Sequence, residues 1–273
     1  MSRDAADMAP LRVYWWKAKP NFGDALSRDV VAHVSGRMVD HAKPGRCDLF
    51  AIGSVLQVAR RNLKARRSDG VRPWVWGSGL LAPVAADFLK NLRVALVRGP
   101  VTAALLGLEH DRFGDPGLLA RETYGPVPER QDVVGIVPHH THMDDPELTE
   151  TVARDPKLRL IDVRGTARRV CQQIATCAHV FASSLHGLIV ADSYGVGSTW
   201  LDPVGQSRLK YLDYAASVGR PMVAPVALAE VRSRMRGLGT GPLPWQDGID
   251  RARDALLTSF PAPLRAATPM ATA

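Results

Sequence analysis

The residues best suited to chemistry form the segment Ser183-Ser184-Leu185-His186-Gly187. It lies between an apolar run at 178–182, typical of a buried strand, and an apolar segment at 188–194 typical of a helix. A strand that leads directly into a helix places His186 at the helix N-terminus, where free N–H groups and the helix dipole favour an anion. An imidazole titrates near neutral pH, so His186 is predicted to act as a general acid or base. The same pattern also fits an ordinary serine N-cap beside a structural histidine.

Two charged residues after other predicted strands extend this candidate site. Arg98 follows a predicted strand at 93–97 and precedes a helix, and its guanidinium could hold a carboxylate or phosphate through two parallel hydrogen bonds. We therefore predict Arg98 to be an anion anchor. Asp24 follows Asn21 and Gly23 at the exit of the first strand, where its carboxylate could take a proton from a hydroxyl, hold a sugar or cap a helix.

Glycines and histidines after further strands have weaker signatures. Gly77-Ser78-Gly79 completes neither a dinucleotide-binding nor a P-loop motif, although Ser78 and Gly79 could approach a ligand. The histidines at 139, 140 and 142, followed by two aspartates, have the composition of a metal site. They lack the helical i, i+4 pairing of strong zinc motifs, so no metal is predicted there.

Short apolar runs alternate with helix-length segments along the chain. This alternation predicts parallel sheets covered by helices, because parallel strands need crossover connections. Predicted strands lie at 11–16, 48–52, 73–76, 93–97, 133–137, 159–163, 178–182 and 199–201. Predicted helices follow Gly23, Gly53 and Arg98, and lie at 146–154, 167–176, 188–194, 228–236 and 248–257.

A segment rich in proline and glycine at 124–130 interrupts the alternation and is predicted to link two domains. We therefore expect an α/β protein with two Rossmann-like domains facing a cleft: residues 1–127, and residues 128–273 with C-terminal helices and a mobile tail of about a dozen residues. Ligands bind such sheets at the carboxyl ends of their strands, where the motifs above all fall.

Composition and charge restrict the cellular location and the partners that we expect. No apolar signal core or membrane-length apolar stretch occurs, which predicts a cytoplasmic protein, and the three cysteines are expected to be reduced core thiols. The net charge of +8 is concentrated in residues 1–128, which hold 19 Lys/Arg against 12 Asp/Glu. Its densest run, residues 60–67, could face anionic lipid, nucleic acid or a phosphorylated substrate, or be a solvated helix end. We favour peripheral contact with the inner face of the plasma membrane and predict no nucleic-acid partner.

The motifs taken together resemble the polysaccharide pyruvyl transferase family. The resemblance extends over roughly residues 11–220 and is carried, in matching order, by segments 21–27, 97–102, 114–119, 135–139 and 183–187. Segments 188–196 and 210–217 are similar to the bacterial exopolysaccharide ketal pyruvyltransferases in particular.

This resemblance implies a fold like that of two-domain GT-B glycosyltransferases, with phosphoenolpyruvate as donor, a sugar hydroxyl as acceptor, and neither metal nor cofactor. It implies that substrate meets Asn21, Gly23, Ser183, Ser184 and Gly187 as well as the residues named above. His139, which follows Pro138 as in the family pattern, is likewise interpreted as a substrate contact. Many family members carry an arginine where this chain has Ser184. The missing charge must come from elsewhere, and the candidates are Arg98, Arg168, Arg208 and Lys210, of which Arg208 and Lys210 lie in or beside the exopolysaccharide-like segment.

The expected activity is therefore transfer of pyruvate from phosphoenolpyruvate onto two hydroxyls of a sugar in a surface polysaccharide or exopolysaccharide, or in its lipid-linked precursor, with release of phosphate. Two alternatives stay open: a GT-B glycosyltransferase that uses a nucleotide sugar, and a non-catalytic basic protein that binds glycans or membranes.

Overall fold

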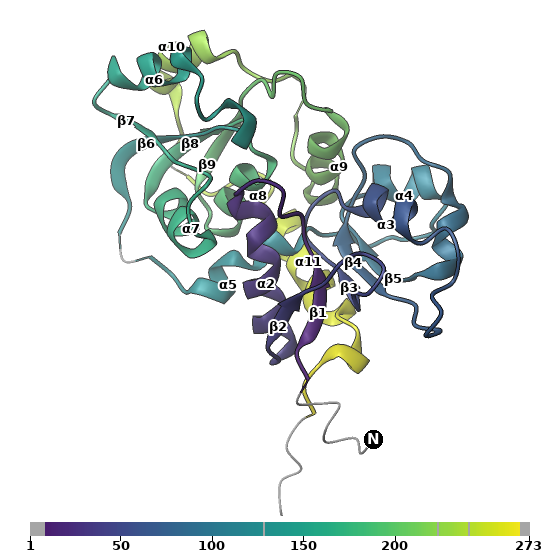
Figure 1. Cartoon of the computed structure of the whole chain (residues 1–273). Helices are drawn as coiled ribbons and strands as arrows, with labels where there is room; N and C mark the ends of the chain where they lie inside the picture. The colour runs from purple at the N-terminus through teal and green to yellow at the C-terminus, as the bar shows by residue number, and fades with distance from the viewer. Residues whose placement is uncertain (1–8, 128, 223, 240, 268–273) are drawn as a thin grey trace, which may run out of the picture.

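The computed structural model describes residues 9–127, 129–222, 224–239 and 241–267, which form two parallel β-sheets with helices around them (Figure 1). The first sheet has the order β2-β1-β3-β4-β5 and the second the order β7-β6-β8-β9. The strands of the first sheet are β1 (Leu11–Tyr14), β2 (Val39–His41), β3 (Leu49–Phe50), β4 (Trp74–Ser78) and β5 (Arg93–Val97). Those of the second are β6 (Gln131–Val137), β7 (Leu158–Leu160), β8 (Cys177–Ala182) and β9 (Gly197–Trp200).

Helices connect most of the successive parallel strands, and further helices follow the last strand, β9. The helices are α2 (Phe22–Ser35), α3 (Leu56–Asn62), α4 (Pro100–Leu106), α5 (Ala120–Tyr124), α6 (Pro146–Ala153), α7 (Ala167–Ala175), α8 (Leu185–Ser193), α9 (Leu209–Val218), α10 (Val231–Arg234) and α11 (Gln246–Ser259). Short 3₁₀ turns are η1 (Ala86–Asn91), η2 (Pro116–Leu119), η3 (His140–His142), η4 (Leu228–Glu230), η5 (Met235–Gly237) and η6 (Ala262–Leu264). The ends of α2 follow from its sequence: Asn21 caps the first turn, and Gly36 adopts φ 69° at the C-cap, a left-handed conformation that favours glycine.

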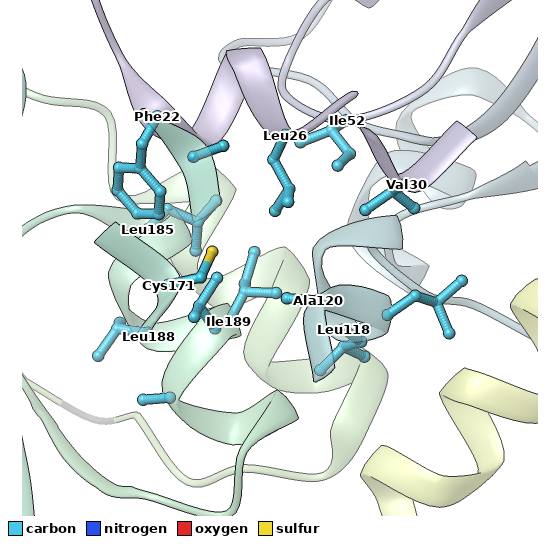
Figure 2. Close-up of a cluster of buried hydrophobic side chains, with 14 of the residues drawn as sticks. Phe22, Leu26, Val30, Ile52, Leu118, Ala120, Cys171, Leu185, Leu188 and Ile189 are labelled. Carbon is cyan, nitrogen blue, oxygen red and sulfur yellow. The ribbon is translucent and has the colours of Figure 1, made fainter. Parts of the chain in front are cut away.

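The two sheets share a hydrophobic core. Helix α2 packs against α7 and η2, and α8 packs against η2 and β9. Figure 2 shows Phe22, Leu26 and Val30 of α2 facing Leu185 and Ile189 of α8 across this core. Every residue of α8 is buried, which explains why its sequence is apolar on all sides rather than on one stripe.

The C-terminal helices return to the first sheet. Helix α11 lies against β4 and β5, and Trp76 Nε1 on β4 donates a hydrogen bond of 3.0 Å to the carbonyl of Leu256. Beyond α11, Phe260 packs on Trp76, and Arg265 donates to the carbonyl of Val34 at 3.0 Å. Residues 262–267 of the predicted mobile tail are therefore held against the first sheet and α2, whereas 268–273 lie outside the described residues. A division into domains at 127/128 stays a prediction.

The expected α/β class with parallel sheets is confirmed, and all eight predicted strands are present within a few residues of their predicted bounds. Strand β2 was not predicted, because it is a three-residue edge strand with no buried side chain. The three cysteines are buried and free, as expected of reduced core thiols. Among the helices of the described residues, none combines the length and apolar character needed to span a membrane.

Candidate functional site

Loops from both sheets surround one pocket of about 570 Å³. Most of its wall follows the carboxyl ends of β1, β3, β4, β6 and β8, the edge where parallel sheets bind ligands. The first sheet and its connections contribute Trp16, Asn21, Asp24, Gly53, Ser54, Val55, Gln57, Val58, Arg61, Leu81 and Ala82. The second sheet and its connections contribute His139, His140, Thr141, Ser184, Leu185, His186, Gln206 and Lys210.

His186 stands at the start of α8, as the sequence predicts. The helix is capped by Ser184, whose Oγ accepts a hydrogen bond from the Gly187 N–H at 3.3 Å. The imidazole lies against the backbone of Gly23, so closely that a Cβ at residue 23 would be 1.9 Å from His186 Nδ1. This contact explains the requirement for glycine in the first turn of α2.

The surroundings of His186 favour its neutral imidazole. Burial lowers the pKa of His186 to about 3, and the positive charges of Lys210 and Arg98 lower it further. His186 Nε2 is buried and has no hydrogen-bond partner among the described residues. A neutral ring that lines the pocket is suited to accept a proton there.

Asp24 enters the pocket from the first turn of α2. Its side chain is only 9% exposed and accepts a hydrogen bond of 2.6 Å from Asn21 Nδ2. Burial raises the pKa of Asp24 to about 7, against the lowering effects of Asn21 and Lys210. At neutral pH this carboxyl group therefore exists in both protonated and ionised forms, which suits a group that gives and takes protons.

Lys210 brings a buried positive charge to the same pocket from the second position of α9. It is 8% exposed, and burial together with the charge of Arg98 lowers the pKa of Lys210 to about 8, whereas Asp24 raises it. Arg208, the other predicted substitute for the missing family arginine, is exposed, does not line the pocket, and lies 6.0 Å from the Trp200 ring. The structure therefore favours Lys210 as the substitute.

Arg98 is placed differently from the prediction. Its side chain is 0% exposed and does not line the pocket, because protein atoms occupy all three guanidinium nitrogens. Nε donates to Asp213 Oδ2 at 2.9 Å, one terminal nitrogen to Ser54 Oγ at 2.8 Å, and the other to the carbonyl of Leu80 at 3.0 Å. This geometry corrects the prediction that Arg98 contacts an anion directly. Arg98 instead holds the hydroxyl of Ser54, and Ser54 lines the pocket.

Two glycines make room for this buried ion pair. A Cβ at Gly79 would lie 2.3 Å from the Arg98 guanidinium, and a Cβ at Gly99 would lie 2.0 Å from the carbonyl oxygen of Asp213. Asp213 also accepts hydrogen bonds from the backbone N–H of Thr102 at 2.8 Å and from its hydroxyl at 2.7 Å. Gly79 therefore serves the packing of Arg98 rather than the predicted approach to a ligand.

Two of the predicted substrate-binding residues are committed to internal contacts. Ser78 is 0% exposed, with its hydroxyl donating to the carbonyl of Gly53 and accepting from the Val55 N–H. Gly187 packs against Val137, where a Cβ would lie 2.7 Å from the valine side chain. Neither lines the pocket, so the predicted ligand contacts of Ser78 and Gly187 are corrected as well.

Ser183 supports the pocket from behind. Its hydroxyl accepts a hydrogen bond from the His139 N–H at 3.0 Å, and its carbonyl accepts one from the Tyr211 hydroxyl at 2.5 Å. Ser183 therefore fixes the β6 loop beside α8 instead of lining the pocket, where its neighbour Ser184 does.

The histidine cluster forms one wall of the pocket. Burial and the nearby charge of Lys210 lower the pKa of His139 to about 3, and its Nδ1 lies 2.8 Å from Thr141 Oγ1. His140 packs 5.3 Å from Trp16, and its Nδ1 is buried without a partner among the described residues. Within those residues no group of three His, Cys, Asp or Glu side chains is arranged to hold a metal ion.

Several pocket residues escaped sequence reasoning. They are Gln57 and Arg61, one turn apart on α3, Thr141 within the histidine segment, and Trp16 and Gln206 in two further loops. Arg61 belongs to the basic run at 60–67, which was assigned to a partner surface rather than to the site. His140 is half-buried in the wall.

Comparison with known proteins identifies the chain. The family model for polysaccharide pyruvyl transferase matches residues 9–203, more than half of the sequence. The chain belongs to the polysaccharide pyruvyl transferase family. The match begins just before β1 and ends shortly after β9, so this pyruvyltransferase family region contains both sheets and all pocket residues except Gln206 and Lys210.

Individual relatives are distant. The chain is 27% identical to the succinoglycan biosynthesis protein ExoV of Rhizobium meliloti over 233 residues, which cover 80% of this chain and 69% of that protein. It is 28% identical to the uncharacterised protein L143 of Acanthamoeba polyphaga mimivirus over 159 residues, 53% of this chain and 54% of that one. A crystal structure of an uncharacterised Klebsiella pneumoniae protein superposes with a TM-score of 0.46 at 14% identity, covering 82% of this chain and 95% of that one.

Proposed function

We propose that this pyruvyltransferase moves pyruvate from phosphoenolpyruvate onto two hydroxyls of one sugar in an exopolysaccharide or its lipid-linked precursor, forming a ketal and releasing phosphate. One observation carries the proposal: in a chain of this family, Asp24, His186 and Lys210 come from three helices to line a single pocket. The similarity to a succinoglycan biosynthesis protein supports an exopolysaccharide acceptor.

The proposed reaction balances without an added oxidant or reductant. A proton adds to the methylene carbon of phosphoenolpyruvate, which becomes the methyl group, and a sugar hydroxyl oxygen bonds to C2. The C2–O bond to phosphate then breaks, and a second hydroxyl oxygen bonds to C2. One of the two hydroxyl protons returns to the enzyme in place of the proton given to the methylene carbon, and the other leaves with phosphate. The enzyme must therefore supply a proton donor, a proton acceptor and positive charge for the anions.

The pocket residues suit these tasks. His186 is neutral and lines the pocket, so its imidazole can take the proton of the attacking hydroxyl. Asp24, with a pKa of about 7, can hold a proton at neutral pH for delivery to the methylene carbon. These assignments give the two groups complementary roles, because one starts unprotonated and the other protonated.

The donor's negative charge is assigned to Lys210 and Arg61, the lysine and arginine side chains on the pocket wall. Anion binding would raise the pKa of Lys210 from about 8 and keep its ammonium charged. The first-turn N–H groups of α8, next to Ser184, would add to this attraction. Lys210 thereby takes the part that an arginine at position 184 would play.

Three further expectations accompany this function. We propose that the two sheets correspond to the halves of a GT-B-like fold with the pocket between them, and that the reaction needs neither metal nor cofactor. Peripheral contact with anionic membrane through the basic run at 60–67 also stays a proposal. Its support is that Arg60, Arg61 and Arg66 are exposed.

Thermal stabilisation tests the donor directly. Phosphoenolpyruvate should raise the Tm of the wild-type protein and UDP- or GDP-sugars should not; the reverse result would favour a glycosyltransferase. With a candidate glycan, each modified sugar should gain the mass of pyruvic acid less one water, with phosphate released in equal amount. His186→Gln should abolish both signals, while His33→Gln, an exposed histidine on the outer face of α2, serves as the matched control.

A further inference from the structure

A second hollow, here named the basic groove, adjoins the pocket on the first sheet. It has a volume of about 690 Å³ and lies between the turn after β2, the C-terminal end of α3 and the loop that follows α3. Six basic side chains line it: Arg12, Arg46, Arg61, Lys64, Arg66 and Arg67. Asp69 is the single acidic residue in the same lining.

Only two of these six cations are neutralised within the described protein. Arg12 pairs with Asp48 at 2.6 Å, and Arg67 pairs with Asp69 at 2.6 Å. The remaining four, Arg46, Arg61, Lys64 and Arg66, are exposed and form no ion pair within the described ranges.

Local structure accounts for only one of the four unpaired charges. Arg61 stands in the last turn of α3, where the helix dipole favours a cation. Arg46, Lys64 and Arg66 lie outside that helix, so the dipole does not stabilise them. Like charges gathered around one hollow repel each other, which favours binding of an anion there.

Arg61 lies at the border of the groove and the pocket, because it lines both. This shared residue supports a path for a chain molecule whose reacting sugar occupies the pocket and whose next sugars lie in the groove. On the proposed function, each transfer leaves a free carboxylate on the modified sugar, so a glycan with more than one modified sugar is a polyanion.

We propose that the basic groove binds the carboxylates of an anionic glycan chain, including ketals already formed, while another sugar of that chain reacts in the pocket. This inference rests on the proposed function. It gives the pyruvyltransferase a preference for acceptors that are already acidic, and it makes the product a ligand of its own enzyme.

A membrane surface fits the groove less well than a chain does. The charges surround a hollow, whereas a bilayer presents a broad face to protruding side chains. Peripheral membrane binding also combines cations with exposed apolar groups. The large exposed apolar side chains of the described residues are Met38, Val71, Leu81, Val204, Leu212 and Leu257, and none of them lines the groove.

Binding to a model polyanion tests the proposal. The wild-type protein should bind a galacturonic acid oligosaccharide at least about tenfold more tightly than a galactose oligosaccharide of the same length at about 50 mM salt, and lose this preference near 500 mM. The variant Arg46→Glu, Lys64→Glu, Arg66→Glu should bind the acidic oligosaccharide at least about tenfold more weakly. It leaves Arg61 and the pocket intact.

The control variant Lys90→Glu, Arg169→Glu, Arg236→Glu changes the net charge equally at exposed sites outside the groove. Equal loss in both variants would overturn the proposal in favour of non-specific attraction. Groove-dependent binding to phosphatidylglycerol vesicles without groove-dependent binding to the acidic oligosaccharide would overturn it in favour of a membrane. If phosphoenolpyruvate stabilises the protein but the acidic oligosaccharide is not preferred, glycan binding in the basic groove is refuted and the proposed function is not. If phosphoenolpyruvate does not stabilise the protein, the proposed function is refuted instead.

Discussion

Replacing Asp24 by asparagine should stabilise the folded protein while removing activity. Asp24 is 9% exposed, and burial raises its pKa from an ordinary value of 3.8 to about 7. That difference corresponds to about 4 kcal/mol of work to ionise the carboxyl group in the folded state. Asparagine has nearly the same shape and carries no charge, so this cost disappears. We expect a net gain of about 1 to 3 kcal/mol near pH 8, because Lys210 loses its carboxylate neighbour at the same time.

The difference in unfolding free energy between Asp24→Asn and wild type should depend on pH. A carboxyl group with a raised folded-state pKa contributes stability that is fully present below about pH 4 and is lost as the pH rises through about 7. As the pH rises from about 4 to about 7, the free energy of unfolding of the wild-type protein should therefore fall relative to that of Asp24→Asn. Near pH 4 the two free energies of unfolding should agree within about 0.5 kcal/mol.

Urea denaturation at several pH values measures the effect. The matched control is Asp40→Asn, which removes an exposed carboxylate on β2 and should leave the difference flat. Turnover of Asp24→Asn should fall by at least about 100-fold, in the range for a lost acid or base. The reasoning fails if Asp24→Asn is less stable than wild type at pH 8, or if its advantage is the same at all pH values.

Three further predictions follow from other contacts. Asp213→Asn leaves Arg98 charged and buried, so it should lower the free energy of unfolding, measured by urea denaturation, by about 3 to 5 kcal/mol. The double variant Arg98→Met, Asp213→Leu should recover most of that loss. Equal instability of the single and double variants would contradict this. Gly23→Ala should displace the His186 ring and lower turnover at least about tenfold, while the circular dichroism spectrum stays unchanged. Full activity of this variant would contradict the prediction. The alkaline limb of kcat/KM should lie near pH 8 and move upward in Lys210→Arg, since guanidinium stays charged; an unmoved limb would assign it to another group.

Sequence reasoning found the part of the site that local pattern controls. Asp24 and His186 each lie in the first turn of the helix that follows a strand, and such positions meet at the carboxyl edge of parallel sheets. Lys210 was identified from the family-like segment, although the helix that carries it, α9, was not predicted. The fold class followed from the alternation of apolar runs for the same local reason.

What sequence reasoning misjudged depends on distant partners. Arg98 has the local setting of an anion anchor, but its counter-ion Asp213 lies 115 residues further along the chain. Gly79 looks like part of a ligand loop until Arg98 is seen packed against it. Trp16 and Arg61 enter the pocket from elements whose relative placement only the folded core determines.

The return of α11 to the first sheet affects how this protein can fold during synthesis. Trp76 on β4 donates its indole hydrogen bond to Leu256, 180 residues later. A ribosome that has released the whole first sheet has therefore not yet released the helix that covers β4 and β5. Since domains that fold as they emerge need their contacts close in sequence, β4 and β5 should lack part of their cover until residues 246–259 have emerged.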